Sequence, residues 1–536
     1  MSISLDLNSL AYSPVSMTPT MEPIPAYVYV CTTIDLKATS ASERPDFFLS
    51  ASFAKFNKPK VVRVFRPPCS DHPAGGIIAF LFNSLEYLNF LEPNDAEIPE
   101  IRFALANAAI SAARLNLALP AGDLKDLIQI AARGPLKSAD LRSAVLVILD
   151  NSLYGYSSQS MSKILLELNA CGFSEKEIDF ALQRFIKAKW QKLNYFDLLQ
   201  LAKAARVASL KWPSIYGRMT DLLKKEEYVP VESVVEGVRQ AALTKLFHDC
   251  VLEHFEYCKP IFFRNLQSLR VANVAEVFRS YGTLHQVNGL TFQMLDLIRQ
   301  STDQMSYKDI KRTLSGLAEL GIHDDNNLDP LCCRLLEIAT SKKIEERDLI
   351  KIIWCLAVTG GNRRVFPFWG QLEDLKPSRL KPEVMRLLYQ SALLSGLELP
   401  GRLNQETVRA EARKWCRKAN LPNDFELSVG REIRRHGVRF KFGQSECGVE
   451  IDMVIRKGDL PPVAVFCDGV RYHHINQLLR YGLSGPDKMA VRLLSSNGFK
   501  VVRIPDVLWR QGRHERGWLY RFFICEGGVN LEFYKE

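Results

Sequence analysis

The sequence has no apolar run long enough to cross a membrane. Its longest runs, such as Ala144–Leu149, fall far short of the ~18 residues that a membrane helix requires. It also lacks a CxxC pair among its 12 cysteines, which argues against a zinc ribbon or a CxxC redox motif. What is present is a 536-residue chain with 47% hydrophobic residues, which is enough for large cores and excludes a mainly disordered protein.

Positive charge is scarce at the start of the chain. No Lys or Arg precedes Lys37, and the first residues show neither a secretory signal nor the Arg-rich amphipathic pattern of a mitochondrial transit peptide. Residues 1–95 are rich in Pro, Ser and Thr in their first part and show no sustained period, although Ala26–Cys31 and Val61–Phe65 could be strands. We predict an irregular arm, which would become ordered by lying on another surface.

The charge is divided unevenly along the chain. Residues 1–100 hold 7 Lys+Arg and 11 Asp+Glu, whereas residues 401–536 hold 24 Lys+Arg and 16 Asp+Glu. The last quarter therefore supplies most of the net charge of +10. Segregated positive charge indicates a polyanionic partner such as nucleic acid, and the alternative is a well-solvated basic surface.

One group of possible metal ligands stands at intervals of four residues. Cys250, His254 and Cys258 share a helical stripe, but on a helix the outer two are about 12 Å apart along the axis. One ion could contact only two of them, so we predict no metal site here and no cofactor elsewhere.

The region 96–400 has a helical pattern that repeats. Similar segments begin at Asp123, Ser160, Asp197, Asp309 and Asp348, with steps of 37, 37 and 39 residues between neighbouring copies. Weaker copies near Val234 and Asn273 divide the long gap. One helix pair per ~37 residues predicts an α-solenoid, and the alternative is an ordinary helical domain with accidental spacing.

Each copy has the same internal pattern. An Asp or Ser can accept hydrogen bonds from the first turn of a helix, and apolar residues follow at the spacing of a buried stripe. Small residues such as Gly172, Ser209, Gly321 and Gly360 can end the first helix. We expect Leu127, Ile164, Leu201, Leu314 and Ile352 to be buried at equivalent positions. Cations recur in these first helices and could line a groove for a nucleic-acid backbone or a solvated face: Arg133, Lys163, Lys203, Arg206, Lys311, Arg312 and Lys351.

The pattern changes within the C-terminal region, 401–536. Four short apolar runs predict strands at Val438–Phe442, Val449–Ile455, Pro462–Cys467 and Lys500–Ile504, with a helix over Asp487–Asn497 before the last strand. This order predicts a small α/β domain. Glu450 and Asp452 would share one face of a strand, and Asp468 would lie at the end of the next.

Residues 449–510 resemble the RAP domain. The similar features are Asp452 in a strand, Asp468-Gly469 after the next strand, Lys488 before a Leu-rich helix, and the closing Ile504-Pro505 with Trp509. Helical repeats followed by such a domain are similar to FAST-kinase-domain and heptatricopeptide-repeat RNA-binding proteins of organelles. The resemblance implies a mitochondrial protein, or alternatively a plastid one, that acts in RNA metabolism. We expect a component of the mitochondrial ribosome that binds and stabilises ribosomal RNA beside neighbouring proteins, without membrane insertion.

The RAP domain in turn resembles the restriction-endonuclease-like fold. Such nucleases hold metal ions with a strand Asp and a second acidic residue, and a Lys offsets the charge that develops on the phosphate. Here Phe466 stands where the family often has Glu, and Asp468 stands where the nuclease Lys would be. We therefore expect a protein without catalytic activity. The alternative is an RNA-processing nuclease with rearranged ligation by Glu450, Asp452 and Asp468.

Cations and aromatic residues around these strands are the candidate RNA-binding residues. Lys and Arg neutralise phosphates, and aromatic side chains stack on unpaired bases. Trp509 is instead expected in the core, because it closes an apolar segment. The candidates are Arg431, Arg434, Arg435, Arg439, Lys441, Arg471, Tyr472, His473, His474, Lys488 and Arg492.

Overall fold

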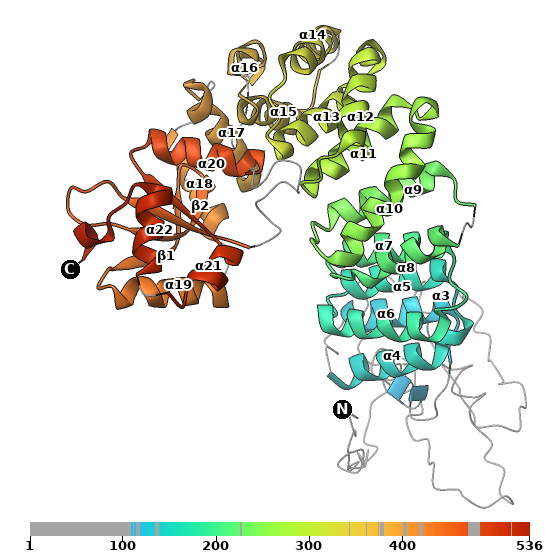
Figure 1. The fold of residues 1–536 in the computed structure, drawn as a ribbon. Helices are drawn as coiled ribbons and strands as arrows, with labels where there is room; N and C mark the ends of the chain where they lie inside the picture. Colours follow the sequence, from blue (N-terminus) through green and yellow to red (C-terminus); the bar gives the residue numbers. More distant parts are fainter. Residues whose placement is uncertain are drawn as a thin grey trace, which may run out of the picture. The chain divides into compact units, whose positions relative to one another are not determined.

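The computed structural model describes residues 109–535 with short gaps. The gaps are 111, 114–117, 134–138, 226–227, 342, 361, 373–374, 376–379, 400–404, 418–421, 470–482 and 516. The arm predicted over residues 1–95 lies outside the described residues. The chain divides into two compact units, Met1–Lys192 and Leu193–Glu536, and each is described by itself (Figure 1).

The first unit contains two helix pairs among its described residues. The helices are Ala121–Arg133 (α3), Ala139–Ser152 (α4), Ser158–Ala170 (α5) and Glu175–Lys189 (α6). The two helices of each pair contact each other, α3 also packs on α5, and α4 packs on α6. Leu127 of α3 and Ile164 of α5 are at most 1% exposed, which confirms that the predicted apolar stripe faces this packing.

The second unit continues the pattern with further helix pairs. Its α-helices up to Arg417 are Tyr195–Val207 (α7), Ser214–Lys224 (α8), Val231–Leu243 (α9), Asp249–Asn265 (α10), Val271–Thr283 (α11), Gly289–Gln300 (α12), Tyr307–Leu320 (α13), Asp325–Ser341 (α14), Glu346–Val358 (α15), Asn362–Trp369 (α16), Pro382–Ser395 (α17) and Gln405–Arg417 (α18). The first helices of successive pairs, α7 to α17, pack on one another in order, and the second helices α8 to α16 do the same (Figure 1). The unit therefore has two layers of helices.

The spacing of the helices confirms a repeating helix pair. From α3 to α17 the first helices begin 36 to 40 residues apart. The weaker sequence copies near Val234 and Asn273 lie in α9 and α11. Leu201, Leu314 and Ile352 are 0% exposed, as their equivalent positions predict. The repeat family stays a prediction.

The helix starts differ from the prediction by three residues. Asn194 and Ser306 are the N-caps of α7 and α13, where Asp197 and Asp309 were expected. Asp197 and Asp309 are the third helical residues, and their carboxylates accept from the backbone N–H of the caps at 3.1 and 3.2 Å. A capping box places polar residues at both positions, so the sequence pattern matches at either of them. The predicted helix ends are confirmed by positive φ at Gly172, Ser209, Gly321 and Gly360.

The C-terminal domain has a four-stranded sheet with helices packed on it. The strands are Phe440–Glu446 (β1), Val449–Ile455 (β2), Val463–Asp468 (β3) and Lys500–Pro505 (β4), in the order β1-β2-β3-β4. The first two pairs are antiparallel, and β3 and β4 are parallel. The crossover between β3 and β4 contains the helix Gly485–Ser496 (α20), as a parallel pair requires. The α/β order predicted from the sequence is confirmed.

Three more helices complete the core of this domain. They are Asp424–Arg435 (α19), Asp506–Gly512 (α21) and Trp518–Gly527 (α22). Val429 and Ile433 of α19 join Met453, Val465 and Ile504 of the sheet in one apolar cluster. Trp509 of α21 belongs to it and is 4% exposed, which confirms its predicted place in the core.

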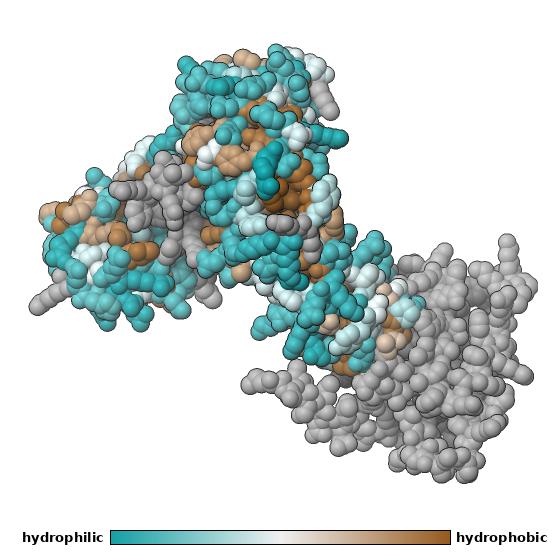
Figure 2. Space-filling model, turned by 45° about the vertical axis from the view of Figure 1, so that its right-hand side comes forward, coloured by the Kyte–Doolittle hydropathy of each residue, from teal (hydrophilic) through white to brown (hydrophobic). Residues whose placement is uncertain are grey.

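No helix within the described ranges has the length and apolarity to span a bilayer. On the face drawn in Figure 2, hydrophilic side chains cover most of the coloured surface and hydrophobic ones form separate patches.

Candidate nucleic-acid interface

Five predicted cations gather where α19 meets β1. The cap Asn423 accepts from Glu426 N at the start of α19, and Gly437, with φ of 76°, turns the chain toward the sheet after the helix. This short connection brings the last turns of the helix close to the first strand. All five cations of the group are exposed: Arg431, Arg434, Arg435, Arg439 and Lys441.

Three of these side chains make contacts that leave their guanidinium groups exposed. Arg434 lies over the ring of Phe440, with its guanidinium carbon 5.0 Å from the ring centroid. Arg431 donates to the carbonyl of Leu427 at 3.4 Å. Arg435 pairs with Glu432 at 2.9 Å, but its side chain is 76% exposed, and such a surface pair contributes little. The cations of this group are therefore exposed, and their role in RNA binding stays a prediction.

A second predicted segment cannot be placed. Arg471, Tyr472, His473 and His474 fall within residues 470–482, which are outside the described residues. Their role in RNA binding stays a prediction.

Lys488 and Arg492 lie elsewhere, at the ends of two repeat helices. They belong to α20, which packs on α13, α15 and α17. Arg492 Nη2 donates to the carbonyls of Ala357 and Val358 at 3.3 and 2.9 Å, and Lys488 Nζ lies 3.5 Å from the carbonyl of Gly321. Both cations thus satisfy carbonyls at helix C-termini, where the helix dipole favours positive charge. We leave these two residues out of the proposed interface, because they hold the domain on the repeats.

The tip of the β1–β2 hairpin makes a second contact with the repeats. Gln390 of α17 donates to the carbonyl of Gly448 at 2.7 Å, and it accepts from the indole N–H of Trp354 at 2.9 Å. Gln390 is 0% exposed, and its amide joins α15, α17 and the hairpin by donating on one side and accepting on the other. The sequence analysis missed this residue, because a Gln in a helix carries no signal of a partner 58 residues away.

The carboxylate that stands at the nuclease-like position is bound by an arginine. Asp468, which is 1% exposed, accepts from Arg503 Nε and Nη2 at 2.8 and 2.7 Å. Arg503 also donates to Asp487 at 2.8 Å, and its guanidinium carbon lies 4.8 Å from the ring centroid of Phe466. Phe466 and Arg503 are neighbours across β3 and β4. Phe466 therefore supports the arginine that neutralises Asp468.

Glu450 and Asp452 lie on one face of β2, as predicted. Both are half-buried between buried neighbours of the strand. Asp452 Oδ2 accepts from the backbone N–H of Cys467 at 2.7 Å. Burial and the nearby charge of Asp452 raise the pKa of Glu450, while Arg386 opposes the shift. Within the described ranges, no three His, Cys, Asp or Glu side chains are arranged to hold a metal ion.

The cluster around His254 is a buried hydrogen-bonded group. His254 is 0% exposed, its Nδ1 lies 3.1 Å from Thr220 Oγ1, and its Nε2 lies 3.8 Å from Cys258 Sγ. Cys250 lies near Gly217 instead: a Cβ added to Gly217 would be 3.5 Å from both Cβ and Sγ of Cys250. Burial lowers the pKa of His254 to about 4, so the ring is neutral at pH 7.

This shift predicts an acid-sensitive stability. The unfolded chain binds a proton at His254 near pH 6.5, whereas the folded chain does so only near pH 4. The neutral ring therefore contributes stability that is fully present above pH 6.5 and is lost as the pH falls toward 4. The free energy of unfolding should be lower by about 2 kcal/mol at pH 5 than above pH 6.5. We expect His254→Leu to flatten this part of the profile of unfolding free energy against pH. Thr220 keeps its bond to the Tyr216 carbonyl, so the variant leaves no unpaired hydroxyl. An unchanged slope between pH 6.5 and 5 would contradict the assignment.

Most predicted repeat cations are paired with residues of adjacent helices. Lys203 pairs with Glu236 at 3.3 Å, and Lys311 with Asp348 at 2.6 Å. Arg206 donates to the buried Gln240 at 2.8 Å. Lys163 and Lys351 are exposed, and the side chain of Arg133 is outside the described part. These pairs join successive repeats, so we do not extend the proposed interface along the first helices.

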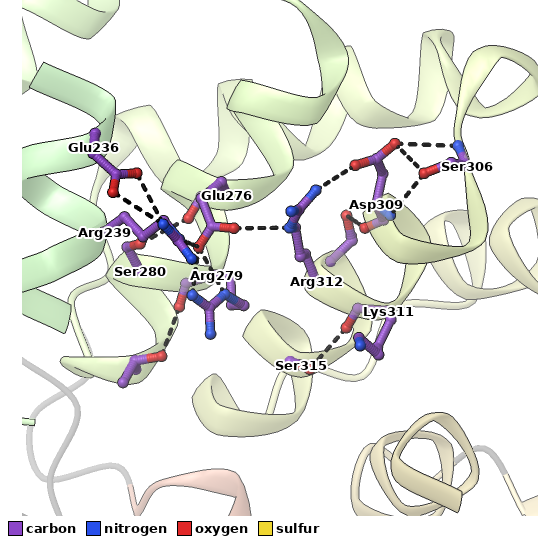
Figure 3. Close-up of polar contacts among 12 residues, drawn as sticks. Glu236, Arg239, Glu276, Arg279, Ser280, Ser306, Asp309, Lys311, Arg312 and Ser315 are labelled. Carbon is purple, nitrogen blue, oxygen red and sulfur yellow. Dashed lines mark hydrogen bonds and ion pairs between the residues drawn. The ribbon is translucent and has the colours of Figure 1, made fainter. Parts of the chain in front are cut away.

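An ion-pair network runs through α9, α11 and α13. Figure 3 shows Glu276 between Arg239, Arg279 and Arg312, which come from the three helices. Glu276 is 6% exposed and lies 2.7 Å from Arg312 Nε, 3.0 Å from Arg279 Nε and 3.7 Å from Arg239 Nε. A buried carboxylate is stable only with such partners. The network therefore joins the first helices of three successive repeats.

No family model matches the chain, and no curated protein matches it at a significant level. The resemblance to the RAP domain therefore depends on the sequence features given above.

Proposed function

We propose that this protein is a non-catalytic RNA-binding protein whose C-terminal domain contacts RNA phosphates through the end of α19 and the start of β1. The observation that carries the proposal is the group of five exposed cations within residues 431–441. The end of α19 and the start of β1 hold the five cations close together. Several phosphates of one RNA strand can therefore be neutralised at once. Release of counterions from those phosphates would supply the affinity.

The proposal of a non-catalytic role is supported by the pairing of Asp468. Arg503 occupies both of its carboxylate oxygens. To ligate an ion, Asp468 would have to give up this bidentate bond in a buried site, which is costly. Phe466 offers no ligand atom beside it.

We further propose that the protein works in the mitochondrion, within the ribosome, where it binds and stabilises ribosomal RNA. This part rests on the resemblance to RAP-domain proteins and on the composition of residues 1–95. An arm rich in Pro, Ser and Thr cannot build its own core, and a surface of RNA and proteins would order it.

Charge reversal at the interface tests RNA binding. We expect the purified protein to bind RNA with an affinity that falls steeply as salt rises, and to cleave none with Mg²⁺ or Mn²⁺. The combined change Arg434→Glu, Arg435→Glu and Arg439→Glu should lower the affinity by about a hundredfold and flatten the slope of log K against log salt, because fewer counterions are released. Fluorescence anisotropy with a labelled RNA at several salt concentrations measures both.

A matched control has the same change of charge in the other unit. Lys176, Lys187 and Lys192 are exposed, and reversing all three should leave the slope near that of the wild type. Equal losses in both triple variants would mean that net charge alone attracts RNA. Cleavage that disappears in Asp452→Ala would contradict the non-catalytic proposal.

Sedimentation of organelle lysate tests the assembly. We expect the protein to migrate with a ribosomal subunit in a density gradient and to stay there through high salt, since many contacts of an arm and a domain would hold it. Ribonuclease treatment before centrifugation should release it. A light peak near the monomer in untreated lysate would contradict a ribosomal role.

A further inference from the structure

The proposed interface contains a groove between α19 and β1. It has a volume of about 400 Å³ and is lined by Asp424, Leu427, Gly430, Arg431, Arg434, Phe440 and Phe442. Sites for small ligands begin at roughly 300 Å³, so the groove suits one flat group and not a folded segment of chain. Its lining combines aromatic rings, two arginines and one carboxylate.

Two aromatic rings form part of the groove. Phe440 and Phe442 meet edge to face, with centroids 4.8 Å apart, and both pack only partly against the core. A Cβ on Gly430 would lie 2.8 Å from each ring, so the absence of a side chain there lets the helix approach the rings closely. Both rings are alternate residues of β1 and therefore lie on one face of the sheet.

The arginines add a planar cation and a phosphate partner. The guanidinium carbon of Arg434 already lies over Phe440, 5.0 Å from the ring centroid. Neither Arg431 nor Arg434 forms an ion pair with a described residue, and both are exposed. A guanidinium plane and an aromatic ring both stack on nucleobases, which is how proteins hold single-stranded RNA.

Asp424 favours a base over a phosphate inside the groove. Its carboxylate repels a phosphate, whereas it accepts hydrogen bonds from the amino group of a base. The phosphates would then lie outside, against the exposed cations. Bases in a duplex are stacked and paired, so only an unpaired strand can offer one.

We propose that this groove binds a base of an unpaired RNA strand, stacked on the pair that Arg434 and Phe440 form. The inference rests on the proposed RNA-binding function and names its substrate class: single-stranded RNA and not duplex RNA. It assigns Arg434 and Phe440 to stacking, and the surrounding cations to the phosphates.

The experiment compares two probes and separates charge from stacking. The probes are a labelled 16-nucleotide RNA without self-complementarity and the same strand annealed to its complement. Wild-type protein should bind the single strand at least about tenfold more tightly. Arg434→Lys keeps the charge and removes the planar group, and Phe440→Leu removes a ring. Each should weaken single-strand binding by about tenfold and leave both duplex binding and the salt slope unchanged.

Controls make the outcome specific. Arg456→Lys is the same exchange at an exposed arginine outside the interface, which lies 5.2 Å from the ring centroid of Phe499, and it should have no effect. Because Arg434 is exposed, its variant folds even if Phe440→Leu does not. Equal affinity for both probes, or single-strand binding that Arg434→Lys leaves intact, would overturn the stacking inference while RNA binding stands. Failure to bind either probe would overturn the proposed function itself.

Discussion

Replacing Arg503 by methionine is expected to lower the free energy of unfolding of the α/β domain by about 3 to 5 kcal/mol. Asp468 and Asp487 both accept hydrogen bonds from this guanidinium, and Asp468 is 1% exposed. Without the cation, the buried carboxylate of Asp468 and the partly buried carboxylate of Asp487 remain as neighbours with no positive charge between them. Methionine retains much of the volume over Phe466, so the loss reports the charge and not a cavity.

A second arginine of the same domain provides the control. Arg456 also lies over a phenylalanine, 5.2 Å from the ring centroid of Phe499, and it pairs with Glu446 at 3.0 Å. Its side chain is 56% exposed, so Arg456→Met should cost under about 1 kcal/mol. Hydrogen exchange of peptides covering β3 and β4 measures the local stability in both variants. Similar losses would show that burial of the Arg503 pair is not what makes it strong.

The repeat array could be read from the sequence because its signal is local. A helix that buries one face must place apolar residues three and four positions apart. The burial of Leu314 and Ile352 can therefore be predicted without knowing which residues they contact. The helix caps were predicted three residues too late for a related reason. In a capping box Ser306 and Asp309 are both polar and exchange hydrogen bonds, and spacing does not tell which comes first.

The partners of charged residues could not be read in this way. Arg492 follows the same pattern as any exposed helix cation, yet it donates to carbonyls 134 and 135 residues earlier in the chain. Likewise, the sequence suggests only that Phe466 replaces an acidic ligand. The structure shows that Phe466 lies beside Arg503 on the adjacent strand. Such roles depend on which elements meet in space. A periodic pattern describes only the element that carries it.

The contact between the start of α20 at Gly485 and the end of α13 leaves no room for a side chain. We expect Gly485→Ala to separate α20 from α13 and to cost about 3 kcal/mol or more, because the change overfills a backbone contact. A Cβ there would lie 1.7 Å from the carbonyl oxygen of Ala318 and 2.9 Å from Gly321 N. Both are backbone atoms, so no side-chain rotation can relieve the clash. Moving α20 also removes the contacts of Lys488 and Arg492 with the helix ends.

Another glycine in the first turn of a helix isolates this effect. Gly122 of α3 has no atom within 4 Å of an added Cβ, so Gly122→Ala should leave stability unchanged or slightly improved. In Gly485→Ala, hydrogen exchange should rise at the C-terminal turns of α13 and α15, where carbonyls lose their cations, and in α20 itself. The four strands should stay protected, because their cluster around Val465 and Ile504 does not include α20. Loss of protection across the whole sheet would instead mean that docking on the repeats is required for the α/β domain to fold.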